Sequence, residues 1–108
     1  MVNEEYKNLL SADELRESLV SLLPGVKDYA IIISAFVTQP AVDLLFEYLS
    51  EAASVSIVCR LHPHDVRSGA TDLSALRIAI QRGAKVSFIQ NLHAKAYLFD
   101  DDILFSGS

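Results

Sequence analysis

The chain has 108 residues and a net charge of −5, with 51% hydrophobic and 21% charged residues. This composition is typical of one globular domain with a single hydrophobic core. The longest uninterrupted apolar run, residues 29–33, is far shorter than the roughly 20 residues that span a bilayer, and the acidic N-terminus does not resemble a signal peptide. We therefore expect a cytoplasmic protein that does not span a membrane.

The charge is distributed unevenly along the chain. Residues 1–53 hold three basic and nine acidic residues, a balance of −6, whereas residues 54–108 hold six basic and five acidic residues, a balance of +1. The acidic half would repel a polyanion, so the net charge disfavours broad nucleic-acid binding. It leaves room for a local cationic site in the second half.

Hydrophobic periodicity predicts strands that alternate with helices. A first helix is expected to begin at a capping box of Ser11 and Glu14 and to end at Pro24. The remaining elements are expected to be a buried strand at 28–36, a helix at 40–53, a strand at 55–60, a loop at 62–71, a helix at 72–82, a strand at 84–90, and strands at 93–99 and 103–107. This order predicts an α/β fold with a mostly parallel βαβαβ sheet, helices on its faces and a C-terminal β-hairpin.

In a parallel sheet, ligands bind beyond the carboxyl ends of the strands. Ser34 lies near the end of the first predicted strand and Arg60 ends the second, so both are candidate substrate-binding residues. The polar loop that follows could be read as a metal cluster, but solvated loop residues are the more common case, and His93 alone adds a possible ligand to His62, His64 and Asp65. We predict no metal and no cofactor. The single cysteine, Cys59, is expected to be a buried small hydrophobic residue.

The last predicted hairpin gathers groups that suit a phosphate ester. His93 and Lys95 stand two residues apart, so they share a face of a strand. A hairpin that pairs Asp100 with Ile103 would place Lys95 opposite Ser108. A neutral imidazole, with a reference pKa of about 6.5, is a nucleophile near pH 7, and an ammonium and a hydroxyl can bind the phosphate oxygens.

The spacing of these residues, H-x-K-x4-D-x6-G-S, resembles the HKD motif of the phospholipase D superfamily. All of its defining positions match, at His93, Lys95, Asp100, Gly107 and Ser108. The resemblance implies metal-independent phosphodiester chemistry, in which a histidine like His93 attacks phosphorus, a second histidine protonates the leaving oxygen, and Lys95 and Ser108 hold the phosphate. Asp100 carries over less directly to catalysis, because an acid at a turn commonly makes local hydrogen bonds.

Superfamily members with one motif per chain resemble bacterial nucleases, including restriction endonucleases and helicase-linked domains, which makes DNA the expected substrate. Two alternatives remain open: a phospholipid hydrolase or transferase, and a non-catalytic binding or assembly domain that retains the hairpin. One motif per chain predicts a homodimer that shares one active site. The family usually has an asparagine two residues after the serine. We therefore expect residues 1–108 to be a phospholipase D-like domain cut inside its motif, with a fused or partner domain beyond Ser108. Its activity in isolation stays open.

Overall fold

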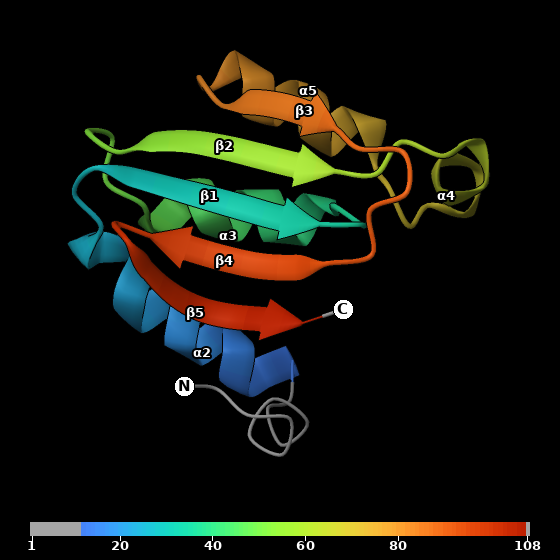
Figure 1. Cartoon of the computed structure of the whole chain (residues 1–108). Coiled ribbons are helices and arrows are strands. Elements are labelled where there is room, and N and C mark those ends of the chain that lie inside the picture. The colour runs from blue at the N-terminus through green and yellow to red at the C-terminus, as the bar shows by residue number, and fades with distance from the viewer. Residues whose placement is uncertain (1–11, 108) are drawn as a thin grey trace.

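The computed structural model describes the backbone of residues 12–107 and the side chains of residues 16–101. It confirms the α/β fold class. The five-stranded sheet has the order β3-β2-β1-β4-β5 (Figure 1). The strands are β1 (Tyr29–Ser34), β2 (Ser54–Cys59), β3 (Lys85–Phe88), β4 (Lys95–Phe99) and β5 (Asp102–Gly107). The neighbours β1, β2 and β3 are parallel, whereas β4 runs antiparallel to both β1 and β5.

Three helices cover one face of the sheet (Figure 1). They are α2 (Ala12–Leu22), which continues into a 3-10 turn η1 (Leu23–Gly25), α3 (Gln39–Tyr48) and α5 (Leu73–Gln81). From β1 to β3 the chain steps across the sheet in one direction, so right-handed crossovers bring α3 and α5 to the same side. The prediction placed helices on the faces of the sheet, and α2, α3 and α5 lie on one of them. No helix in the described part of the chain is long and apolar enough to cross a membrane.

The hydrophobic core lies between these helices and the sheet. Alternate strand residues point into it: Ala30 is paired with Val55 on one side and Phe99 on the other, and all three are buried. From the helices, Val42 and Leu76 belong to the same cluster. Cys59 is buried too, as predicted, and its burial raises the pKa of the thiol. The alternation of side chains along β1, β2 and β4 therefore determines which residues lie on the helix-covered face. This holds up to the edge of the sheet where the parallel strands end, which we call the carboxyl edge.

The segment predicted as a loop at 62–71 contains a short helix, α4 (Pro63–Ser68). Figure 1 shows α4 beyond the carboxyl ends of the parallel strands. Pro63 lies in its first turn, and Gly69 follows its last residue with a φ of 83°. Proline and glycine indicate loops, but they are also the favoured residues at the start and just past the end of a helix. The loop prediction was wrong because it took Pro63 and Gly69 as loop residues and not as the two ends of a helix.

The predicted turn of the terminal hairpin was placed one residue too late. Phe99 pairs with Asp102, so the loop consists of Asp100 and Asp101 alone. Both have positive φ, 50° and 79°, as a type I′ turn requires. Aspartate tolerates this left-handed conformation better than most residues, which explains why a run of acids can form the tight turn.

The strand register differs from the prediction as well. A shift between Tyr97 and Leu98 leaves Lys95 opposite Gly107, where Ser108 was predicted. The earlier turn alone would place Ser106 opposite Lys95, and the irregularity moves this pair by one residue, to Gly107. Ser108 and Ser11 lie outside the described residues, and only the backbone of Glu14 is described, so the predicted capping box stays a prediction.

The carboxylate of Asp100 joins the hairpin turn to the start of β1. It accepts the backbone N–H groups of Lys27 at 2.6 Å, Asp28 at 2.7 Å and Tyr29 at 2.9 Å. In return, the Asp100 N–H donates to the carbonyl of Tyr29 at 3.1 Å. The hydrogen bond from Lys27, followed by those from Tyr29 and Asp28, lowers the pKa of Asp100. This geometry supports the structural role for Asp100.

The substitution Asp100→Asn is expected to lower the melting temperature at pH 7, because it replaces one of the two accepting oxygens by an amide nitrogen, which cannot accept an N–H group, and removes the negative charge. The folded-state pKa lies below the ordinary 3.8, so the carboxylate's contribution is complete above 3.8 and is lost as the pH falls through the folded-state value. The melting temperatures of wild type and variant should therefore converge below pH 3.8. Glu47→Gln, at an exposed position on α3, is the control. A difference that does not change with pH would contradict the assignment.

Candidate active site

An open cleft of about 310 Å³ lies at the carboxyl ends of β2 and β3. It is the edge at which parallel sheets bind ligands. The lining residues come from the end of β2, the start of α4 and the loop between β3 and β4: Arg60, His62, His64, Asp65, Gln90, Asn91 and His93. The cleft thus contains all three histidines of the chain.

His93 reaches the cleft from the loop between β3 and β4. It was predicted to begin the fourth strand, but β4 starts at Lys95, so strand alternation does not set the direction of the His93 side chain. The preceding residue, Leu92, is buried, and its N–H donates to the carbonyl of Ile89 at 3.3 Å. His93 is exposed beside this buried anchor. An exposed imidazole on a loop that is held by a buried residue can contact a substrate without any movement of the sheet.

Lys95 and Ser34 are neighbours at the same edge of the sheet. They are paired across β4 and β1, and directly opposed residues share a face. The Lys95 ammonium lies 5.9 Å from the centroid of the Tyr97 ring. The Ser34 hydroxyl is mostly buried and donates to the carbonyl of Phe36 at 2.9 Å. Ser34 therefore uses its hydroxyl to close the end of β1, and it does not line the cleft.

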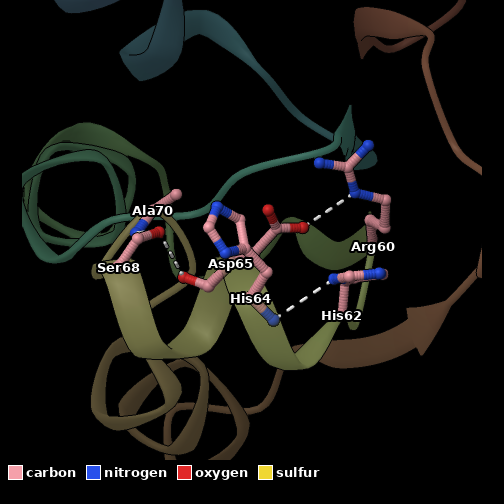
Figure 2. A network of polar contacts seen from close by, with 6 residues as sticks. All are labelled: Arg60, His62, His64, Asp65, Ser68 and Ala70. Atoms are coloured by element: carbon pink, nitrogen blue, oxygen red, sulfur yellow. Dashed lines mark hydrogen bonds and ion pairs between the residues drawn. The ribbon is translucent and has the colours of Figure 1, made fainter.

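Arg60 is held in place from two directions. Its Nε donates to the Asp65 carboxylate at 2.8 Å, in an ion pair whose side chains are only 18% and 7% exposed (Figure 2). Its guanidinium carbon also lies 5.0 Å from the centroid of the Phe36 ring. The hydrogen bond from Arg60 holds the pKa of Asp65 below its usual value. Figure 2 shows the two terminal nitrogens of Arg60 extending beyond the ion pair. Two planar donors at a fixed position are suited to bind phosphate oxygens.

His62 and His64 stand at the start of α4. The Nδ1 atom of His62 accepts the backbone N–H of His64 at 3.2 Å (Figure 2). In the neutral ring of His62, this bond leaves Nε2 to carry the proton as a donor. The side chain of His62 thus caps the first turn of α4 and presents an N–H group at the cleft.

Residues 62–65 were predicted to be solvated loop residues, with a metal cluster as the alternative. Among the described residues, no group of three or more His, Cys, Asp or Glu side chains is placed to hold a metal ion. Asp65, the acid of this segment, is buried against Arg60. Three residues of the segment, His62, His64 and Asp65, line the cleft.

The predicted site residues therefore separate into groups. His93 and Arg60 both line the cleft. Lys95 and Ser34 are paired across neighbouring strands at the same edge of the sheet. Asp100 lies just past the other end of β4, about 15 Å from Lys95 along the strand. Sequence reasoning missed the lining roles of His62, His64, Gln90 and Asn91. Their signal was present, because they too follow the carboxyl ends of parallel strands.

No protein-family model matches the chain, and a search among curated proteins finds no match.

Proposed function

We propose that this protein is a metal-independent phosphodiesterase of the phospholipase D superfamily that cleaves DNA through a phosphohistidine intermediate. One observation carries the proposal: His93, the nucleophile position of the HKD spacing, lines the same cleft as the positioned guanidinium of Arg60. A nucleophile and an anion-binding group at one site are what transfer of a phosphoryl group requires.

In the proposed mechanism, a ring nitrogen of His93 attacks the phosphorus atom of the scissile diester. The bond between phosphorus and the leaving oxygen breaks, and that oxygen takes up a proton from a general acid. Water then attacks the phosphohistidine and gives a proton to the deprotonated general acid. The bond between phosphorus and nitrogen breaks, which releases the phosphate monoester and restores the imidazole. The terminal nitrogens of Arg60 bind the non-bridging oxygens, whose negative charge grows in the transition state. Lys95, at the same edge of the sheet, adds positive charge.

A homodimer that shares one active site would supply the second histidine as the general acid. We expect sedimentation to show a dimer, and DNA cleavage per protein molecule to rise with protein concentration through the dissociation constant of that dimer. A monomer that is fully active at every concentration would contradict the shared site. The proton would then have to come from the same chain, whose cleft also holds His62 and His64.

The function is tested with the full-length protein, supercoiled plasmid DNA and excess EDTA. We expect nicked and linear DNA, because no step uses a metal ion. A parallel reaction with phosphatidylcholine vesicles, monitored by choline release, tests the lipid alternative. Choline release without DNA cleavage would replace the nuclease by a phospholipase. DNA binding without cleavage of either substrate would indicate a binding domain.

A further inference from the structure

Exposed hydrophobic residues lie near the carboxyl ends of the parallel strands, at the same edge of the sheet as the cleft. Six large hydrophobic residues are exposed in the described part of the chain, and four of them end or follow the three parallel strands. These four, with exposed fractions of 44–51%, are Phe36, Leu61, Phe88 and Ile89. We call them the apolar rim. Exposed apolar groups that gather beside a polar cleft indicate a surface that meets a ligand.

The backbone holds the segments that carry the apolar rim against one another. The N–H of Arg60 donates to the carbonyl of Ala35 at 3.4 Å, which joins the end of β2 to the residue before Phe36. The N–H of Ile89 donates to the carbonyl of Cys59 at 2.9 Å, which joins the end of β3 to the end of β2. The segments that carry the apolar rim are therefore joined to one another along the carboxyl edge.

Arg60 lines the cleft and also lies over the Phe36 ring. The guanidinium that lines the cleft lies over the Phe36 ring, 5.0 Å from its centroid, while 47% of Phe36 stays exposed. A cationic group for the phosphate thus stands directly beside an aromatic surface. Proteins that bind single-stranded nucleic acid combine these two elements, since the cation binds the backbone and the ring stacks on a base.

From this arrangement we propose that the protein selects single-stranded DNA, with a base stacked on Phe36 and the adjoining phosphate bound by Arg60. The inference rests on the proposed function for the identity of the substrate. Base pairs in a duplex are already stacked on their neighbours, so a duplex cannot offer an unstacked base to the ring. The lining residues also suit a phosphate, because their one acid, Asp65, is already paired with Arg60.

The test measures binding by fluorescence anisotropy in a full-length His93→Ala background, which prevents turnover. Three labelled probes of equal length are compared: a twelve-nucleotide oligothymidine, a duplex, and an abasic strand with the same phosphates. The oligothymidine should bind at least about tenfold more tightly than the abasic strand. Phe36→Leu should remove about this factor for oligothymidine and leave abasic binding unchanged, and Phe36→Trp should restore it.

Ile80→Ala is the matched control, because Ile80 is 55% exposed but lies near the end of α5, away from the cleft. It should change no affinity. Equal binding of the abasic strand and oligothymidine, or tighter binding of the duplex, would overturn the inference, as would no binding at all. Cleavage is scored separately in the protein with intact His93. Base-dependent binding without cleavage would refute the nuclease and keep the stacking surface, whereas cleavage without base-dependent binding would do the reverse.

Discussion

Replacing His93 with alanine is expected to abolish DNA cleavage, with a loss of at least about 10³-fold in kcat, and to leave the fold intact. In the proposed mechanism the imidazole bonds to phosphorus, and alanine has no group that could replace it. The side chain is exposed, and its removal opens no cavity in the core. The melting temperature should therefore stay close to that of the wild type. The measurement is the initial rate of plasmid nicking, together with thermal unfolding by circular dichroism. A folded variant that keeps a tenth or more of the activity would contradict the role of His93.

Substitution of Arg60 is expected to produce the second largest loss. Arg60→Met should lower kcat/KM by roughly 10²-fold, because it removes the charge that stabilises the phosphate oxygens. Arg60→Lys keeps a positive charge, but it should recover little of the loss, since an ammonium cannot bond Asp65 and also present two planar donors to a phosphate. Because Arg60→Met leaves the buried Asp65 unpaired, rates are measured well below the melting temperature.

The chain provides a matched control for the arginine. Arg82 also lies over an aromatic ring, 5.1 Å from the centroid of Phe46, but it follows α5 and takes no part in the candidate cleft. Arg82→Lys should keep the wild-type rate. If Arg60→Lys and Arg82→Lys behave alike, the guanidinium of Arg60 has no special role in binding phosphate.

The sequence predicted the fold class because its periodic segments are long and separated by clear helix and strand ends. It could not predict the hairpin register, since three successive acids, 100–102, offer more than one possible turn. The turn is selected by contacts between Asp100 and the N–H groups before β1, more than 70 positions away in sequence. A local pattern contains no information about such a distant partner. The helix α4 was missed for a different reason, because Pro63 and Gly69 are equally suited to a loop.

Part of the candidate site followed from a topological rule. The carboxyl ends of parallel strands indicated Arg60 and Ser34, and Arg60 does line the cleft. Ser34 does not line the cleft, because its hydroxyl donates to the carbonyl of Phe36. The sequence does not show this local hydrogen bond. His93 was expected on the same strand as Lys95 and lies in a loop. The predicted position of His93 was therefore wrong in its local structure, and its role as nucleophile stays a prediction.

In the proposed mechanism, His93 becomes covalently bonded to phosphorus during turnover. The direct measurement is to mix the full-length protein with a phosphorus-labelled oligonucleotide, stop the reaction within one turnover in alkaline denaturant, and locate the label by peptide mass spectrometry. We expect one phosphate-linked adduct on the peptide that contains His93, formed and lost at rates compatible with cleavage, and absent from His93→Ala. Cleavage by the wild type with no adduct on this peptide, or an adduct on another residue, would contradict the account.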